Sequence, residues 1–254
     1  DYGVRRDYVA RNVADTAIKV LNVGVRDKIT PFTKDELKSL IAATEDRRTG
    51  RSARRSGPLF KAMVYLGAFC GLRLGEIAAL RSDDIDFDKS IIYVRHSLTR
   101  FDELKGPKTA AGRRDVPLPS YVAEAIQAAI SFAVPNDRGY IFRTRAGGNL
   151  HASGGFRSYW AWLVDLAGIS READGTVRHF HALRHYAGSS WLEAGIPLAD
   201  VSRLLGHAST AVTAQVYMHA LGTNQLKATA METCGALLLP APKGQITQEL
   251  RNAA

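Results

Sequence analysis

The segment RHFHALRHYAGSSWLEAGIPLADVSRLLGHASTAVTAQVYMHA (residues 178–220) holds five of the chain's seven histidines, three arginines and two tyrosines. Its background is otherwise rich in Ala and Leu. The pattern predicts a helix over 179–194, in which the spacing i, i+3, i+4 places His181, Arg184 and His185 on one face. A helix that faced only solvent would carry Lys and Glu at these positions. Imidazoles and a guanidinium on one face therefore indicate a negatively charged partner.

The charge of the whole chain indicates which kind of partner this is. Lys and Arg number 34 against 25 Asp and Glu, a formal net charge of +9. Such an excess is typical of proteins that bind polyanions such as nucleic acids. The longest apolar run, 62–72, is shorter than the roughly 20 residues of a membrane-spanning helix, so no membrane partner is expected.

Cysteine usage predicts a reduced, cytoplasmic protein. Only Cys70 and Cys234 are present, and they form no CxxC motif. Cys70 lies in an apolar stretch and is expected to pack in the core. The chain begins at Asp1 and not at Met, as a fragment of a longer protein does.

The first part of the chain predicts a linker and two helices. Residues 1–29 are polar and basic and lack an apolar face. Thr33 and Glu36 form a capping-box pattern at the start of one helix, and Pro58 predicts the start of a second, apolar helix that ends near Gly71. Five arginines between these helices are expected in a loop, either solvated or in contact with phosphate: Arg47, Arg48, Arg51, Arg54 and Arg55.

The rest of the chain predicts a mainly α fold with a small antiparallel β-sheet, an α+β class. Two β-branched stretches, 90–97 and 113–119, predict strands joined by a long polar loop. Ser120 is expected to cap a helix that ends at Phe132, and 140–144 is a predicted short strand. Further helices are predicted at 74–80, 153–167, 198–206, 209–220 and 225–238.

Four polar stretches stand out on this apolar framework. They are GLRLGE (71–76), GPKTAAGRRDVPL (106–118), HALRH (181–185) and LLGHASTAVTAQVYMH (204–219). Each alone is a common surface or core pattern. Their order, however, is Arg, Lys, His-x-x-Arg, Leu-Gly-His and then Tyr ten residues later. In this order the chain resembles the tyrosine recombinases, the phage integrase family, over residues 30–235.

The resemblance implies a domain organisation. Residues 1–29 correspond to the end of an N-terminal core-binding domain and a linker, and 30–232 to a tyrosine recombinase catalytic domain. The tail, 233–254, is expected to dock in trans on a neighbouring protomer. Whether an arm-binding domain precedes the chain stays open.

The resemblance also assigns roles to individual residues. Arg73 and Arg184 are expected to clamp the nonbridging oxygens of a DNA phosphodiester, because planar guanidinium groups bind phosphate bidentately. Tyr217 is the expected nucleophile that forms a 3′-phosphotyrosine, and His181 its base. The remaining predicted roles belong to Lys108 as general acid for the leaving 5′-oxygen, His207 as a hydrogen-bond donor to the phosphate, and Glu76 as the carboxylate that orients Arg73.

No cofactor is expected, because the ester bond conserves the energy and the cations supply positive charge. An alternative metal site at His179, His181 and His185 is weakly supported, since HExxH is absent. His179 and His185 are interpreted as framework or phosphate-side residues. Tyr186, beside apolar residues, is predicted to be in the core.

The leading hypothesis is therefore a site-specific recombinase or integrase of a phage or other mobile element, acting in the cytoplasm of a bacterial host. Its expected partners are double-stranded DNA at attachment or core sites, a homo-tetramer on synapsed DNA, and accessory DNA-bending or directionality proteins. Two alternatives remain open: a type IB topoisomerase without strand exchange, and a non-catalytic DNA-binding protein.

Overall fold

The computed structural model describes residues 30–45, 50–106, 110–144, 146–150, 154–172 and 175–217. The described residues from Pro31 onward belong to one unit of the chain. Their fold is mostly helical with small antiparallel sheets, so the predicted fold class is confirmed. None of the helices in these ranges is long and apolar enough to cross a membrane.

The first described helix, α3 (Lys34–Thr44), begins at the predicted capping box. The Thr33 hydroxyl accepts a hydrogen bond from the Glu36 amide at 3.1 Å, and the Thr33 amide donates to the Glu36 carboxylate at 2.8 Å. These bonds satisfy two amides that a helix N-terminus leaves unpaired. The buried face of the helix includes Leu37 and Leu40.

Helix α4 (Gly50–Phe69) corrects one prediction. Pro58 lies inside this helix and does not begin it, although a proline removes one backbone donor and costs stability. Ser56 and Gly57 directly precede Pro58, but the earlier turn contains Ala53 and three arginines, which have high helix propensity and favour helix on that side. Arg51, Arg54 and Arg55 are therefore helical and not in a loop, and the predicted loop residues 47 and 48 lie outside the described residues.

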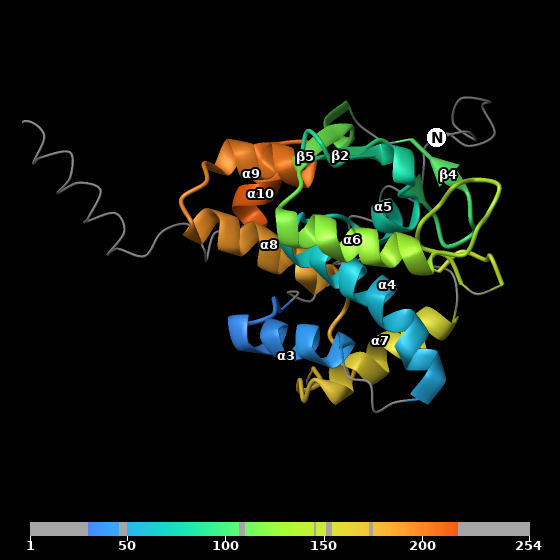
Figure 1. Ribbon diagram of the computed structural model, residues 1–254. Coiled ribbons are helices and arrows are strands. Elements are labelled where there is room, and N and C mark those ends of the chain that lie inside the picture. The colour runs from blue at the N-terminus through green and yellow to red at the C-terminus, as the bar shows by residue number, and fades with distance from the viewer. Residues whose placement is uncertain are drawn as a thin grey trace, which may run out of the picture. The chain divides into compact units, whose positions relative to one another are not determined.

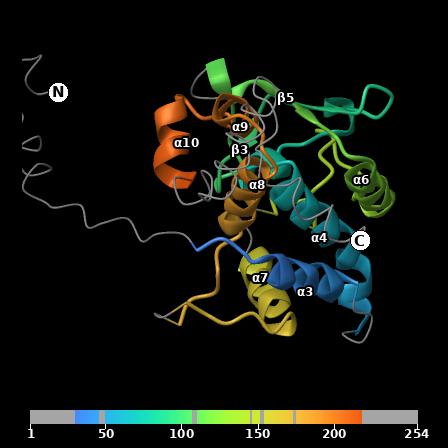
Figure 2. The same ribbon diagram turned by 90° about the vertical axis from the view of Figure 1, so that its left-hand side faces the viewer.

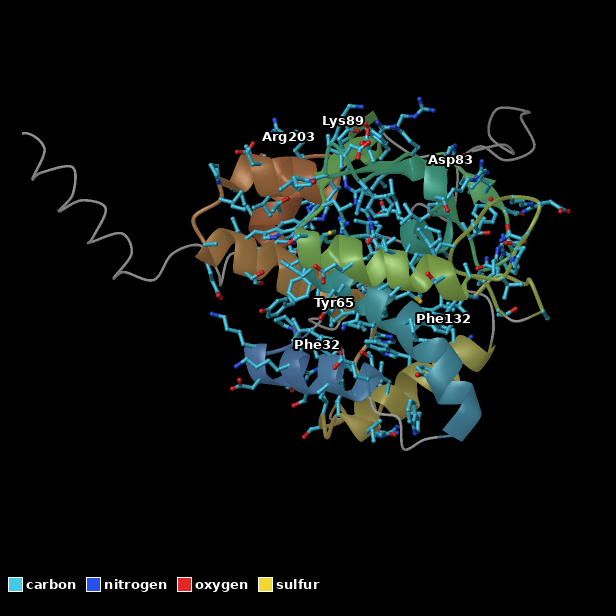
Figure 3. The ribbon with its side chains drawn as sticks, in the orientation of Figure 1. Phe32, Tyr65, Asp83, Lys89, Phe132 and Arg203 are labelled. Carbon is cyan, nitrogen blue, oxygen red and sulfur yellow. The ribbon has the colours of Figure 1, made fainter. Side chains whose placement is uncertain are left out.

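Helix α4 is the centre of the core. It packs most extensively against α6 (Ser120–Phe132) and α8 (His181–Glu193), and it also contacts α3 and α5 (Leu74–Ala78). Figures 1 and 2 show these helices around α4, with α7 (Gly154–Leu166) beside α3. Side chains fill the space between the helices, whereas Lys89 and Arg203 project from the surface (Figure 3). Cys70, at the end of α4, is fully buried, as predicted.

The predicted pair of strands is present as the main sheet. Its strands β1 (Ile85–Asp86), β2 (Ile91–Val94) and β5 (Arg114–Pro117) are antiparallel in the order β1-β2-β5. Val94 pairs with Arg114, and Ile92 with Val116. Short 3-10 turns, η2 (Ser82–Asp84) and η3 (Ala110–Gly112), precede β1 and β5. The polar loop between β2 and β5 contains a second hairpin, β3 (Ser97–Leu98) with β4 (Leu104–Lys105), which the sequence did not predict.

Two further predictions were wrong. Ser120 is the first residue of α6 and not its cap, because Pro119 takes the N-cap position and no side chain caps the helix. The stretch 140–144 forms no strand. Tyr140 bridges to Arg81 and Arg143 to Asn149, so the stretch has two different partners and no continuous one.

The described chain ends with α9 (Leu198–Leu205) and α10 (Thr210–Tyr217), close to the predicted bounds. Gly206 ends α9 in the left-handed conformation, with φ at 64°, which favours glycine. The predicted helix at 225–238 and the tail from 233 lie outside the described residues.

Candidate active site

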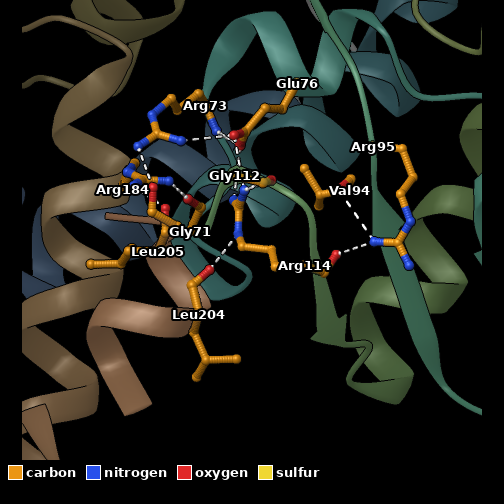
Figure 4. A network of polar contacts seen from close by, with 11 residues as sticks. Gly71, Arg73, Glu76, Val94, Arg95, Gly112, Arg114, Arg184, Leu204 and Leu205 are labelled. Carbon is orange, nitrogen blue, oxygen red and sulfur yellow. Dashed lines mark hydrogen bonds and ion pairs between the residues drawn. The ribbon is translucent and has the colours of Figure 1, made fainter. Parts of the chain in front are cut away.

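The site forms where α5, α8, α9, α10 and the first residue of β5, Arg114, meet. Arg73 is the N-cap residue of α5, and Arg184 lies in the first half of α8. Although Arg73 and Arg184 are 111 positions apart in the sequence, Arg184 Nη1 donates to the Gly71 carbonyl at 2.7 Å, two residues before Arg73. Figure 4 shows both guanidinium groups beside Glu76 and Arg114.

Glu76 is the buried anion of this network. Its carboxylate accepts two hydrogen bonds from Arg114, both at 2.9 Å, and one from Arg73 Nη1 at 2.8 Å. The Arg73 amide also donates to it at 2.8 Å. Burial would raise the pKa of Glu76, but the hydrogen bonds and charges of Arg114, with the charges of Arg73 and Arg184, outweigh burial and lower it to about 2. Glu76 is thus ionised and fixes the direction of Arg73.

The C-terminus of α9 receives the remaining guanidinium donors. Arg114 Nε donates to the Leu204 carbonyl at 2.6 Å and Arg73 Nη2 to the Gly206 carbonyl at 3.2 Å. Arg184 Nη2 donates to the Leu205 carbonyl. The last carbonyls of a helix lack intrahelical partners and carry the negative end of its dipole, so they attract these cations. Three arginines consequently converge on one helix end.

Arg184 is 1% exposed. Burial, followed by the positive charge of Arg73, lowers the pKa of Arg184 to about 9. The guanidinium therefore stays charged at neutral pH. Arg73 is more open, with 38% of its side chain exposed. Of the two predicted phosphate-binding arginines, Arg73 is accessible to solvent and Arg184 is buried.

His207 follows the arginine-capped end of α9 directly. Its amide donates to the Ser202 carbonyl at 3.0 Å, and its Nδ1 lies 2.7 Å from the Thr213 hydroxyl of α10. Burial, together with the charges of Arg184 and Arg73, lowers the pKa of His207 to about 4. The imidazole is neutral at physiological pH and held by one ring nitrogen.

His181 and His185 continue the site along α8. Their ring centroids lie 5.0 Å apart, and the His185 ring lies 5.6 Å from that of Tyr217. His181 has an exposed edge, but the protein atoms around the rest of its ring, together with the charges of His185 and Arg184, lower its pKa to about 4. A neutral His181 has a free lone pair and can accept a proton. His179 is exposed at the start of this segment.

Tyr217 is 1% exposed and rests against α8. Its hydroxyl donates to the Arg184 carbonyl at 3.4 Å, and its ring covers Gly188, where an added Cβ would lie 2.5 Å from Tyr217 Cζ. Burial raises the pKa of Tyr217 to about 12, although the charges of Arg184 and Arg73 oppose this. In this conformation the hydroxyl is protonated and shielded, so it must become exposed before it can react with a large substrate.

The structure thus places six of the seven predicted site residues in one region, namely Arg73, Glu76, His181, Arg184, His207 and Tyr217. The seventh, Lys108, lies outside the described residues, between β4 and β5. Tyr186 packs partly buried against the core. In the described ranges, no group of three or more His, Cys, Asp or Glu side chains is arranged to hold a metal ion.

Sequence reasoning missed Arg114, Thr213 and Gly188. Arg114 had a usable signal, because it alternates with Val116 and Leu118 and therefore shares their buried face. A buried arginine requires a carboxylate partner. Thr213 and Gly188 gave no such signal, since their contacts join separate helices.

Comparisons with known proteins identify the family of this chain. The sequence pattern of the phage integrase family matches residues 31–223. This chain belongs to the phage integrase family.

Curated relatives of this integrase-family chain are recombinases. It is 29% identical over 269 aligned positions to a protein named tyrosine recombinase XerC-like from Caldanaerobacter subterraneus subsp. tengcongensis, which covers 94% of this chain and 63% of that protein. It is 30% identical over 195 positions to tyrosine recombinase XerC of Chlamydia trachomatis, with 75% and 54% covered. The chain therefore spans between about half and two thirds of the length of these relatives.

Solved structures share the fold of this family member. The Tn1549 transposon integrase in complex with a circular intermediate DNA has a TM-score of 0.68 at 23% identity, covering 92% of this chain and 74% of that chain. XerA recombinase has a TM-score of 0.58 at 22% identity, with 87% and 69% covered. At these identities the likeness establishes the fold.

Proposed function

We propose that this chain is the DNA-cleaving domain of a site-specific recombinase that works through a 3′-phosphotyrosine on Tyr217. The observation that carries the proposal is the Arg73–Glu76–Arg114 network beside buried Arg184, with the Tyr217 hydroxyl bonded to the carbonyl of Arg184 itself. A network that fixes two cations next to a phenol favours cleavage of a phosphodiester, because this reaction needs a nucleophile and stabilisation of the negative charge on the phosphate oxygens.

Arg73 and Arg184 are proposed to bind the nonbridging oxygens of the scissile phosphate. In the free protein their donors bond to the carbonyls of Gly71, Leu205 and Gly206. A phosphate that reaches Arg73 exchanges a weak carbonyl acceptor for a charged one, and charge-assisted hydrogen bonds are the stronger kind. Glu76 keeps Arg73 directed toward the site during this exchange.

In the cleavage step, the Tyr217 oxygen attacks phosphorus while the bond from phosphorus to the 5′-oxygen breaks. The phenol proton passes to His181, which is neutral and can accept it. Lys108 gives a proton to the leaving 5′-oxygen, and His207 donates a hydrogen bond to the phosphate. The phosphotyrosine ester conserves the energy of the broken bond, so a 5′-hydroxyl from another strand can reverse the step and complete strand exchange.

The biological setting follows as part of the same proposal. We assign the chain to a phage or other mobile element, with double-stranded attachment or core sites as substrate and a tetramer on synapsed DNA as the acting assembly. We further propose that the chain acts on DNA in a bacterial cytoplasm. Accessory proteins that bend the DNA or control the direction of recombination are its expected partners there. The XerC relatives carry recombinase names, which supports recombination over a topoisomerase.

The test begins with a library of DNA duplexes of random sequence that each carry a nick. When the protein cleaves near the nick, the short fragment with the new 5′-hydroxyl diffuses away. Religation is then impossible, and the covalent protein–DNA adduct is trapped. Adducts that resist SDS are sequenced for the DNA and mapped by mass spectrometry for the modified peptide. We expect a nucleotide attached through its 3′-phosphate to Tyr217, and no adduct with Tyr217→Phe at nearly unchanged DNA affinity, because phosphate charge dominates binding.

Tyr186→Phe is the matched control, because Tyr186 lies in the same segment but packs against the core. It should form adduct at the wild-type rate. An adduct that persists in Tyr217→Phe would remove Tyr217 from the proposed role. Adduct formation without synapsis of two trapped sites would favour the topoisomerase alternative.

A further inference from the structure

We propose that Thr213 is a positioning residue for the cleavage reaction: its hydroxyl donates to Nδ1 of His207 and thereby keeps the imidazole proton on Nε2, the nitrogen that donates to the phosphate. The inference rests on the proposed function, because it concerns the hydrogen bond between His207 and the scissile phosphate. It assigns a role to a buried side chain on α10, the helix that also carries Tyr217.

The backbone of His207 is fixed at the end of α9. Gly206 ends this helix in the left-handed conformation, and the His207 amide donates to the Ser202 carbonyl, five residues earlier, at 3.0 Å. This bond closes a Schellman motif, in which the last turn of a helix is tied to the residues that follow it. The Gly206 carbonyl also accepts from Arg73 Nη2 at 3.2 Å. His207 therefore begins at a defined place beside a predicted phosphate-binding arginine.

The His207 ring needs its proton on one particular nitrogen. Burial and the charges of Arg184 and Arg73 lower its pKa to about 4, so the ring is neutral at physiological pH. A neutral imidazole has one donor and one acceptor nitrogen, and the hydrogen bond that one nitrogen makes decides the state of the other. Nε2 has no hydrogen-bond partner among the described residues, and the residue is partly exposed. Nε2 is thus available to a phosphate, but it donates only when it carries the proton.

The Thr213 hydroxyl selects between the two tautomers. Its oxygen lies 2.7 Å from His207 Nδ1, and Thr213 is 0% exposed. Within the described ranges, Nδ1 is the only hydrogen-bond partner of this hydroxyl. If Nδ1 carried the proton, the hydroxyl would accept it and its own hydrogen would be buried without an acceptor, which is costly. With the proton on Nε2, the hydroxyl donates to Nδ1 and both groups are satisfied.

The same bond joins two parts of the site, which gives a competing explanation. Thr213 lies four positions before Tyr217 in α10, and the ring centroids of His207 and Tyr217 are 6.4 Å apart. A bond that served only as a tether would hold α10 in place, and its loss would slow cleavage of every substrate alike. Loss of the hydrogen bond from His207 to the phosphate affects only those substrates whose oxygen accepts that bond.

The first measurement locates the imidazole proton in the free protein. The histidines are labelled with 15N, and the signals of His207 are assigned by their absence from the spectrum of His207→Ala. Protonated and unprotonated ring nitrogens have well-separated 15N shifts. We expect the proton on Nε2 in wild type and in Thr213→Ser, which keeps the hydroxyl, and a mixture of tautomers in Thr213→Val. A proton on Nδ1 in wild type, or an unchanged tautomer in Thr213→Val, would overturn the inference.

The second measurement is single-turnover adduct formation at saturating protein on nicked duplexes of the trapped sequence. Thr210→Val is the matched control, because it makes the same change at an exposed position of α10. We expect Thr213→Val to slow cleavage on the order of tenfold, a fraction of the roughly hundredfold or more that one preorganised donor contributes. Thr213→Ser and Thr210→Val should stay within about twofold of wild type. Wild-type rates in Thr213→Val, or an equal loss in Thr210→Val, would contradict the positioning role.

A sulfur in place of one nonbridging oxygen of the scissile phosphate separates the hydrogen bond from a tether. Sulfur is a weaker acceptor than oxygen, so wild type should cleave one stereoisomer more slowly, and His207→Ala identifies this isomer by losing the difference. On it, Thr213→Val should bring the ratio of oxygen to sulfur rates to within about twofold of the ratio in His207→Ala. Thr213→Ser and Thr210→Val should keep the wild-type ratio. A wild-type ratio in a slowed Thr213→Val would assign Thr213 to a tether and refute the inference.

The inference and the proposed function fail in different ways. If wild type forms no adduct at Tyr217, the proposed function fails and the catalytic role of Thr213 fails with it, while the spectrum of the free protein still decides the tautomer. If wild type forms the adduct but His207→Ala has the same oxygen-to-sulfur ratios, His207 does not bind the phosphate and the inference fails alone.

Discussion

The contact between Tyr217 and Gly188 allows a quantitative prediction for Gly188→Ala. The new Cβ would lie 2.5 Å from Tyr217 Cζ, 2.7 Å from Cε1 and 2.8 Å from the hydroxyl oxygen. Carbon atoms in ordinary contact are about 3.5 Å apart or more, so the ring must move by roughly 1 Å. Tyr217 is fully buried, and overpacking of this kind costs about 1–3 kcal/mol.

The same substitution also stabilises α8. Alanine is favoured over glycine in a helix interior by about 1 kcal/mol. The net effect of Gly188→Ala on the free energy of unfolding should therefore lie between no change and a loss of about 2 kcal/mol. When Tyr217 is truncated first, the clash disappears and only the gain of about 1 kcal/mol should remain.

The assay is urea unfolding of four proteins: wild type, Gly188→Ala, Tyr217→Ala and the double variant. The double-mutant cycle should give a coupling energy of about 1–3 kcal/mol between the two positions, with Gly188→Ala destabilising or neutral in the first background and stabilising in the second. An equal effect of Gly188→Ala in both backgrounds would refute the packing of Tyr217 on α8.

Three further outcomes are expected. Arg114→Met should lower the free energy of unfolding by about 3–5 kcal/mol, because it removes the buried ion-pair partner that donates two hydrogen bonds to Glu76 and leaves the carboxylate with Arg73 alone, and adding Glu76→Gln should recover part of this loss in urea titrations. The pKa values of His181 and His207 are lowered from 6.5 to about 4 in the folded state. The unfolded chain therefore binds more protons between these values, so the Tm should fall as pH drops from 6.5 to 4, and less steeply when both histidines are replaced by Asn. Between pH 4.5 and 2, Glu76 binds a proton in the unfolded chain but not in the folded one, because its pKa is lowered from 4.5 to about 2, so the Tm should fall further. EDTA should not reduce adduct formation, and a loss restored by zinc would instead assign a metal to the histidines.

Local patterns account for the parts of the structure that the sequence predicted well. The capping box at Thr33 and Glu36, the antiparallel pairing of β2 with β5, and the bounds of α7 and α9 depend on neighbouring residues or on simple periodicity. The errors occurred where a local signal competed with its context. Pro58 predicts a helix start, but the residues before it continue the helix, and 140–144 has β-strand composition but no continuous partner.

The sequence by itself determined the types of the candidate site residues and their order along the chain, because a guanidinium, an imidazole or a phenol has its chemistry wherever it lies. Only the tertiary structure decided how these groups are held. Arg114 meets Glu76 across 38 positions, and the Tyr217 hydroxyl meets the Arg184 carbonyl across 33. Contacts between such distant positions depend on how α5, β5, α8 and α9 pack. Packing likewise decided that Tyr217 is buried and that Thr213 meets His207, since burial and contacts between separate elements arise from the assembled core and have no periodic signature in the chain.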